Sequence, residues 1–154
     1  MSVDKPYTGR FAPSPSGPLH FGSLLAALAS FLDARSHRGS WLVRMEDLDP
    51  AREPPGTADL ILRTLETFQL CWDGDVVYQS QRQSAYDEAI SILKQQDLCF
   101  HCACPRQRLR ELKGIYDGHC RSMNLPDPGN ALRLRADDQY IRFEDAIQGS
   151  HQQN

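Results

Sequence analysis

The stretch RFAPSPSGPLHFGSL, residues 10–24, decides the fold of this chain of 154 residues. Residues 7–11 predict a strand, residues 12–18 carry three prolines and a glycine and predict a turn, and a helix is expected from residue 19 to about residue 36. Backbone N–H groups at a helix start, with the positive end of the helix dipole, favour binding of a phosphate group. From these residues alone, a turn whose histidine and glycine serve only packing is an equally good interpretation.

The residues that follow extend this unit into an α/β fold. Apolar side chains recur at helical spacing and are expected to form a buried stripe: Leu24, Leu25, Leu28, Phe31 and Leu32. Gly39 is expected just past the helix end, and residues 41–45 predict a second strand. A strand, a helix and a strand in this order form a right-handed crossover with parallel strands.

Further elements are expected downstream. A second helix over residues 57–68 should present one apolar face: Ala58, Ile61, Leu62, Leu65 and Phe68. Ser80 and Gln83 have the spacing of a capping box, which predicts a third helix up to about residue 96. Residues 131–135 and 141–143 predict two short strands. Cys71, next to Trp72, is interpreted as a small buried hydrophobe.

Composition and charge narrow the class of protein. The hydrophobic share of 40% suits a globular domain, and no apolar stretch approaches the length of about 18 residues that spans a bilayer. Without a signal-peptide pattern, the expected location is the cytoplasm, with no membrane partner. The net charge of −3 offers no global attraction for nucleic acid, so any RNA contact must be local. Residues 106–113 are the densest basic segment, and charge alone favours a solvated helix face.

A second candidate site lies in WLVRMEDLDPAR, residues 41–52. Glu46, Asp47 and Asp49 follow a predicted strand of a parallel sheet, where open α/β sheets bind their ligands. From the residues alone, this is either a magnesium site or a charged loop.

A cysteine-rich segment, CFHCACPRQRLRELKGIYDGHC, spans residues 99–120. Cys102 and Cys104 flank a single residue, so both sulfurs can bind one soft cation, and Cys120 can return to it. Structural zinc takes four ligands in a tetrahedron, mostly thiolate or imidazole. Chemistry alone leaves the fourth ligand open, with histidine the general favourite, among four residues: Cys99, His101, Tyr116 and His119. A redox pair of Cys99 and Cys102 is the alternative, although no thioredoxin-like context surrounds it.

Residues 10–24 resemble the His-Ile-Gly-His signature of class I aminoacyl-tRNA synthetases, in the form found in glutamyl enzymes. Phe21 replaces the usual aliphatic residue, and Ser23 stands where other branches carry the second histidine. The resemblance implies that His20, Gly22 and Ser23 act on ATP. It also implies an amino-acid pocket made by five consecutive residues, whose arginine suits a carboxylate: Arg10, Phe11, Ala12, Pro13 and Ser14.

Two further motifs extend the resemblance over residues 9–149. MEDLDPAR is similar to the Arg-Ile-Glu-Asp-x-Asp motif of glutamyl synthetases, which implies that Glu46 faces the amino group of the substrate. Asp47 and Asp49 are then expected to hold the loop and Arg52. The segment YQSQRQSAYDEAI, residues 78–90, matches the Tyr-x-Gln-Ser-x-Arg segment of the same family in place and order.

The cysteine segment resembles the short glutamyl-Q tRNA(Asp) synthetases, which show Cys-x-Cys followed by Tyr-x-x-x-Cys-Arg. This resemblance implies one zinc ion per chain on Cys102, Cys104, Tyr116 and Cys120. It also implies ATP- and magnesium-dependent activation of glutamate, transfer of glutamate to the queuosine base of tRNA(Asp), and a monomeric enzyme. The implied fold is a Rossmann-like half-fold of a class I synthetase with a zinc-bearing insertion.

The expected organisation has three parts. Residues 1–98 form the first half of the catalytic domain, residues 99–149 the zinc-binding insertion and the start of the return, and residues 150–154 a tail or a truncation end. None of the three lysines has a Lys-Met-Ser-Lys-Ser-like context, so the chain is expected to be an incomplete catalyst. Two alternatives stay open: a fragment of an ordinary glutamyl-tRNA synthetase, and a non-catalytic zinc module that binds tRNA or a partner.

Overall fold

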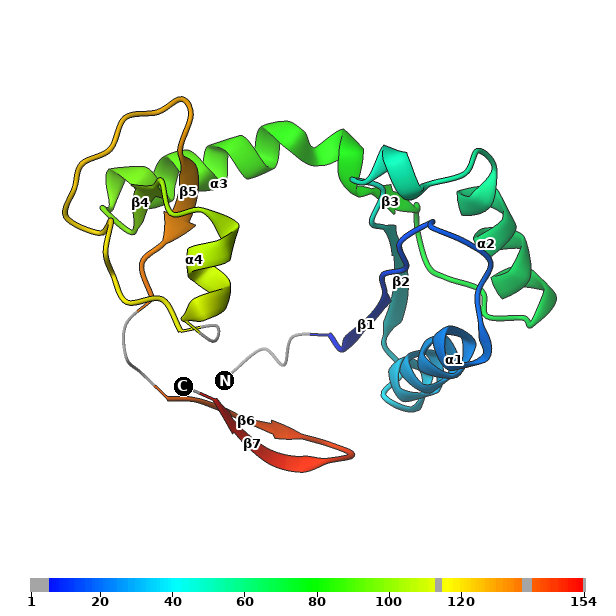
Figure 1. The fold of residues 1–154 in the computed structure, drawn as a ribbon. Helices are drawn as coiled ribbons and strands as arrows, with labels where there is room; N and C mark the ends of the chain where they lie inside the picture. The colour runs from blue at the N-terminus through cyan, green and yellow to red at the C-terminus, as the bar shows by residue number, and fades with distance from the viewer. Residues whose placement is uncertain (1–5, 113–114, 137–139, 154) are drawn as a thin grey trace. The chain divides into compact units, whose positions relative to one another are not determined.

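The structure is a computed structural model that describes residues 6–112, 115–136 and 140–153 (Figure 1). The backbone divides into two compact units, Met1–Ala85 and Tyr86–Asn154. This division falls near the beginning of helix α3 (Gln83–Gln95), whereas the sequence-based boundary between half-fold and insertion follows the end of that helix. Within the described ranges, no helix is long and apolar enough to cross a lipid bilayer.

The first unit is built on a parallel sheet. Strands β1 (Thr8–Phe11), β2 (Ser40–Met45) and β3 (Val77–Tyr78) lie in the order β1-β2-β3, and both pairings are parallel. Helix α1 (Phe21–Ser36) connects the first two strands (Figure 1). The predicted strand–helix–strand crossover is therefore confirmed.

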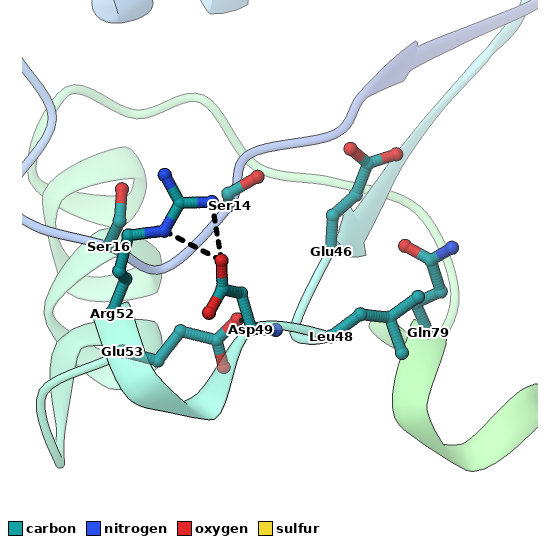
Figure 2. A pocket seen from close by; sticks show the side chains of 8 residues that line it. All are labelled: Ser14, Ser16, Glu46, Leu48, Asp49, Arg52, Glu53 and Gln79. Atoms are coloured by element: carbon teal, nitrogen blue, oxygen red, sulfur yellow. Dashed lines mark hydrogen bonds and ion pairs between the residues drawn. The ribbon is translucent and has the colours of Figure 1, made fainter. Parts of the chain in front are cut away.

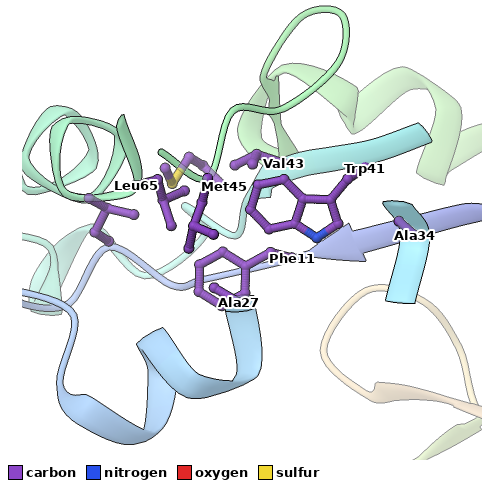
Figure 3. Close-up of a cluster of buried hydrophobic side chains, with 9 residues drawn as sticks. Phe11, Ala27, Ala34, Trp41, Val43, Met45 and Leu65 are labelled. Atoms are coloured by element: carbon purple, nitrogen blue, oxygen red, sulfur yellow. The ribbon is translucent and has the colours of Figure 1, made fainter. Parts of the chain in front are cut away.

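One face of this sheet carries the core of the first unit. Strand β2 alternates along its length, and Trp41, Val43 and Met45 are almost completely buried. Both α1 and α2 (Thr57–Thr67) cover this face, because residues of both helices belong to the same cluster (Figure 3): Ala27, Ala34, Ile61 and Leu65.

Two glycines allow close approach in this core. A Cβ on Gly9 would lie 3.0 Å from the Cβ of Ala34, so only glycine lets α1 approach β1 this closely. A Cβ on Gly39 would lie 2.3 Å from the carbonyl oxygen of Tyr7, a distance that no side chain can adopt. The predicted end of α1 near Gly39 is thus fixed by the backbone of the neighbouring strand.

The predicted buried stripe of α1 is wrong for three of its leucines. Leu25, Leu28 and Leu32 are 54%, 40% and 56% exposed, whereas the helix packs through Ala27 and Ala34, with Leu24 and Phe31, the other two predicted residues, packed against the same core. Small side chains bring the helix axis close to the sheet, and the leucine side of the helix then faces away from it. The helix also begins at residue 21, two residues later than predicted, because His20 acts as its N-cap.

Three local predictions in the first unit need correction. Ser80 does not cap α3, because it lies in a 3-10 turn (Gln79–Arg82) and its hydroxyl donates to Asp47 over 2.5 Å. Cys71 is exposed, and Leu70 takes the buried position beside it. Phe68 is 58% exposed at the end of the otherwise correctly predicted apolar face of α2.

The second unit contains two antiparallel pairs and a short helix. Strand β4 (Cys99–Cys102) pairs with β5 (Ala131–Leu134), and β6 (Ile141–Asp145) pairs with β7 (Gly149–Gln153). Strand β7 thus covers most of the stretch that was expected to be a tail. The basic segment forms α4 (Arg106–Glu111), and its Lys113 lies outside the described residues.

Replacing a core leucine of α2 should destabilise the first unit selectively. Leu65→Ala should lower the free energy of unfolding by about 2–5 kcal/mol, because it leaves a cavity in place of a fully buried side chain. Leu60→Ala, the same change at a position that is 46% exposed, should cost about 1 kcal/mol or less. Urea unfolding followed by tryptophan fluorescence measures both, since Trp41 and Trp72 lie in this unit. Equal losses in the two variants would contradict the assigned core.

Candidate active site and metal centre

The proline-rich turn after β1 is tied to the end of β2. Pro13 and Pro15 are buried, whereas Ser14 and Ser16, which follow them in turn, are exposed. The carbonyl oxygen of Pro13 accepts a hydrogen bond of 3.0 Å from the backbone N–H of Glu46. The two sequence motifs of the first unit therefore meet through their backbones at the carboxyl ends of adjacent parallel strands.

His20 and Ser23 form a closed pair at the start of α1. The ring Nδ1 of His20 accepts from the backbone N–H of Ser23 over 3.2 Å, and its Nε2 lies 3.1 Å from the Ser23 hydroxyl. Because Nδ1 is the acceptor, the ring proton is on Nε2 and donates to that hydroxyl. A Cβ on Gly22 would lie 3.1 Å from the His20 ring, so glycine leaves room for the ring against the helix start.

A cavity of about 510 Å³ lies along this turn, and we call it the turn cavity. Its walls include six residues predicted to bind ATP or the amino acid: Phe11, Ala12, Pro13, Ser14, His20 and Ser23. Gly22 is not part of the lining. The turn cavity therefore gathers most of the first predicted constellation around one space.

A second cavity, of about 370 Å³, lies beside Glu46, and we call it the Glu46 cavity (Figure 2). Ser14 and Ser16 line both cavities, so the two spaces share a wall. Sequence reasoning missed three of the side chains around the Glu46 cavity: Leu48, Glu53 and Gln79. Gln79 belongs to the third family motif, residues 78–90, and this motif could have indicated that Gln79 lies near the site.

The acidic residues after β2 divide into different roles. Asp47 accepts from the backbone N–H and the hydroxyl of Ser80, over 2.9 and 2.5 Å. Burial alone would raise the pKa of the Asp47 carboxyl, but the hydrogen bonds from Ser80 outweigh it and lower that pKa below its ordinary value. Asp49 accepts from Arg52 Nε over 2.6 Å. Both contacts hold the loop, which leaves Glu46 free to face the cavity.

Arg10 is not brought into either cavity. It lies on β1 opposite Leu42 of β2, and its side chain is exposed. Since neighbouring side chains of a strand point to opposite faces, Arg10 lies on the other face from the buried Phe11. Among the predicted pocket residues within the described ranges, Arg10 is thus the one on the uncovered side of the sheet.

Three cysteine sulfurs come together in the second unit. The Sγ atoms of Cys102, Cys104 and Cys120 all lie within 4.8 Å of one another, and those of Cys104 and Cys120 are 3.5 Å apart. A tetrahedral zinc site with Zn–S bonds of about 2.3 Å separates neighbouring sulfurs by about 3.8 Å. The cluster therefore has the dimensions of a metal site.

Tyr116 lies at this cluster. Its hydroxyl oxygen is 3.5 Å from the sulfur of Cys102 and 3.9 Å from that of Cys104, and it accepts a 2.8 Å hydrogen bond from the backbone N–H of Cys120. Its ring is stacked on Phe100 at 5.8 Å, with the guanidinium of Arg133 5.4 Å from its centre. These contacts orient the phenol toward the sulfurs.

The other candidates for the fourth position are directed elsewhere. Cys99 and His101 alternate with Cys102 along β4, so they lie on the opposite face of that strand. His119 is exposed, and its backbone N–H donates to Asp117. Within the described residues, the group of close cysteine, histidine and carboxylate ligand atoms contains the three cysteines and no histidine.

Burial and hydrogen bonds shift the pKa values of the cluster in different directions. Burial alone would raise the pKa of the Cys102 thiol, but hydrogen bonds led by that from Tyr116 outweigh it and lower the pKa to about 6. Burial and the same hydrogen bond raise the pKa of the Tyr116 phenol. Burial and the hydrogen bonds with Cys120 and Cys102 raise the pKa of the Cys104 thiol, although Arg108 acts in the opposite direction, whereas Arg133 helps to lower the pKa of Cys102.

Comparison with known proteins places this architecture in a family. Residues 7–149 match the family of class I tRNA synthetases (E and Q), catalytic domain. The chain is 56% identical to the glutamyl-Q tRNA(Asp) synthetase of Cronobacter sakazakii and 55% identical to that of Serratia proteamaculans, in each case over 97% of its length. It spans about half the length of these curated relatives, 50% and 49%.

Among solved structures, a glutamate tRNA ligase from Elizabethkingia meningosepticum, in complex with its amino acid, superposes with a TM-score of 0.81. The two sequences are 25% identical, and the match covers 97% of this chain and 36% of that one. The predicted class I synthetase fold and the predicted resemblance to the glutamyl-Q enzymes are both confirmed. The chain belongs to the class I tRNA synthetases for E and Q and carries part of their catalytic domain.

Proposed function

We propose that this chain supplies the glutamate- and ATP-binding segments of a ligase that attaches glutamate to the queuosine base of tRNA(Asp). The observation that carries the proposal is the shared wall of the turn cavity and the Glu46 cavity, since Ser14 and Ser16 line both. Two substrates that must react need adjacent sites that open to each other. The names of the curated relatives favour the glutamyl-Q branch over an ordinary glutamyl-tRNA synthetase. A tRNA substrate suits the predicted cytoplasmic location, and we expect a monomer.

In this mechanism the protein positions its substrates and stabilises charge. ATP, with magnesium, would lie along the turn cavity, where the Ser23 hydroxyl and the start of α1 offer donors to its phosphates. Glu46, which lines the Glu46 cavity, would hold the ammonium group of glutamate. A carboxylate of glutamate would attack the α-phosphorus in line, which expels pyrophosphate and forms the glutamyl adenylate. No covalent bond to the protein is required.

The second unit would hold one structural zinc ion on Cys102, Cys104, Cys120 and Tyr116. The distances of the Tyr116 oxygen to two of the sulfurs, 3.5 and 3.9 Å, suit an oxygen and a sulfur on one tetrahedral zinc, which lie about 3.5 Å apart. Zn²⁺ would reverse the raised pKa of this phenol, because a bound cation favours the anionic form of its ligand. Arg108 and Arg133 would balance the negative charge that four anionic ligands leave on such a site.

Zinc content tests the metal site directly. Protein purified without added metal should contain about one zinc ion per chain, measured by mass spectrometry of the metal. Cys102→Ser and Cys104→Ser should lose it, because each removes one of four bonds. Tyr116→Phe should weaken zinc binding in competition with a chromophoric chelator.

Matched variants serve as controls for the zinc experiment. Cys99→Ser changes a thiol on the opposite face of β4, and His119→Ala removes the imidazole that directly precedes Cys120 in the chain. Both variants should keep full zinc. Loss of zinc in His119→Ala, with retention in Tyr116→Phe, would transfer the fourth position to His119. Full zinc in a Cys102→Ser, Cys104→Ser double variant would show that the site is misassigned.

Glutamate binding tests the Glu46 cavity. Glu46→Gln should weaken glutamate binding about tenfold or more, because a hydrogen bond between charged groups contributes about 1.5–3 kcal/mol and 1.4 kcal/mol is a factor of ten. Calorimetric titration would measure this, with Glu66→Gln on the exposed side of α2 as the matched control. Unchanged affinity in Glu46→Gln, or equal affinity for glutamine and glutamate in the unmodified protein, would contradict the assignment.

Activity should depend on residues that this chain does not contain. Its 154 residues should give a rate of glutamate-dependent pyrophosphate exchange about 100–1,000-fold below that of a chain of the relatives' full length. The reason is that none of its three lysines has the Lys-Met-Ser-Lys-Ser-like context of a donor that stabilises the leaving phosphates. The full-length chain should transfer glutamate only to tRNA(Asp) that carries queuosine. Transfer to the 3′ end of tRNA(Glu) would identify an ordinary glutamyl enzyme, and zinc binding without any activation would identify a non-catalytic module.

A further inference from the structure

A third cavity, of about 270 Å³, lies in the second unit beside the cysteine cluster, and we call it the insertion cavity. Its volume corresponds to roughly nine water molecules, which leaves ample room for a phosphate group and several waters. Its lining is mainly polar, and five of the polar or charged residues are Asp97, His101, Arg121, Asn124 and Arg135. The proposed glutamate and ATP sites do not use this space, and one residue of the proposed zinc site, Cys120, forms part of its wall.

Two arginines are fixed at the insertion cavity by backbone acceptors. Arg121 Nη2 donates to the carbonyl oxygen of Ala136 over 2.9 Å, and Arg135 Nη2 donates to that of Arg121 over 3.3 Å. The guanidinium of Arg135 also lies 5.6 Å from the centre of the Phe100 ring. Each guanidinium has five N–H donors in a rigid plane, so these contacts position the groups and leave most donors unused.

Three buried nitrogen atoms of the lining have no hydrogen-bond partner among the described residues. They are the Nε atoms of Arg121 and Arg135 and the Nε2 atom of His101. A buried donor without an acceptor costs about 1–3 kcal/mol, and native proteins satisfy nearly all such groups. Because these atoms are fully buried, a ligand in the cavity would bond the Nη atoms at the ends of the two guanidinium groups.

A nearby carboxylate, Asp97, pairs with only one of the two guanidinium groups, that of Arg135. The Asp97 side chain is 86% exposed, and its oxygen lies 3.4 Å from Arg135 at the long end of a hydrogen bond. Asp127 is paired with Lys94 at 3.2 Å and lies 3.6 Å from His101 Nε2, beyond hydrogen-bond distance. The insertion cavity therefore keeps an excess of positive charge, in a chain whose net charge is −3.

We propose that the insertion cavity is a binding site for a phosphate group. A phosphate offers oxygen acceptors in several directions, which suits donors that come from two arginines on different segments, whereas a carboxylate offers one planar edge. The group could belong to an RNA backbone or to free phosphate or pyrophosphate, and all three present the same oxygens. This proposal stands independently of the proposed enzymatic function, because binding of phosphate requires neither activation of glutamate nor a further domain.

The first test uses inorganic phosphate and the unmodified, zinc-loaded chain. Two-dimensional ¹H–¹⁵N NMR spectra recorded during a titration at constant ionic strength should show saturable shifts for the amides of Arg121, Asn124 and Arg135. The same titration with chloride should leave these amides unshifted. Shifts that never saturate, or that chloride reproduces, would overturn the proposal without any substitution in the chain.

Substitutions then locate the site. Arg135→Gln should weaken phosphate binding about tenfold or more, since it removes a charged donor, while Arg110→Gln, the same change at an exposed residue of α4, should leave it unchanged. Zinc content and the dispersion of the NMR spectrum verify that both variants are folded. Equal weakening in the two variants would overturn the site.

Parallel titrations with pyrophosphate and with a short single-stranded RNA distinguish the sources. Tighter saturable binding of RNA at the same amides assigns the cavity to a phosphodiester, and tighter binding of pyrophosphate assigns it to a free anion. Binding of RNA that leaves these amides unshifted, together with no response to phosphate or pyrophosphate, rejects the cavity as a phosphate site.

Discussion

The first unit depends on the close packing of α1 against the pair of parallel strands. Gly9 allows α1 to approach β1 closely, and the small side chains of Ala27 and Ala34 lie at the contact. Trp41 packs in the same core, and its indole N–H donates to the Ser30 hydroxyl over 2.9 Å. Because the helix lies so near the sheet, the turn before it must be tight. That turn carries Ser14 and ends at His20, so both cavities of the first unit follow from this packing. The packing of α1 against the sheet therefore determines where the turn cavity and the Glu46 cavity lie.

Acidic side chains then fix the loops around this core. Asp73 accepts from Arg35 over 2.6 Å and from the backbone N–H of Trp41 over 2.7 Å, which joins the end of α2 to α1 and β2. The hydrogen bond from Arg35, followed by that from Trp41, lowers the pKa of the Asp73 carboxyl. Asp47 has the corresponding role between β2 and the turn after β3. Glu46 lies between these anchored segments, and its side chain carries no comparable set of hydrogen bonds within the described residues; its closest charged neighbour is Arg44, at 3.6 Å.

The second unit depends on its cysteines for a different reason. Its buried cluster consists of Phe100, Cys102 and Cys120, with Cys104, Tyr116 and Leu125 packed against it. Such a small apolar core cannot offset much conformational entropy, and small units of this kind are commonly stabilised by a metal. All four residues of the proposed zinc site belong to the core of this unit or pack against it, so metal binding and folding would be coupled there.

The sequence by itself determined most of the helices and strands of this protein and the segments proposed to carry its chemistry. The apolar run of residues 41–45, the glycine after α1 and the Cys102–Cys120 spacing are local signals, and the crossover follows from chain order and handedness. The tertiary structure alone decided which of the apolar side chains of α1 face the sheet, because a leucine stripe and an alanine stripe have the same period. It also decided that Ser80 bonds Asp47 instead of capping a helix, that Gln79 lines a cavity with Glu46, and that Tyr116, not a histidine, lies against the sulfurs. These outcomes depend on contacts between segments far apart in the chain, and local spacing contains no information about such distances.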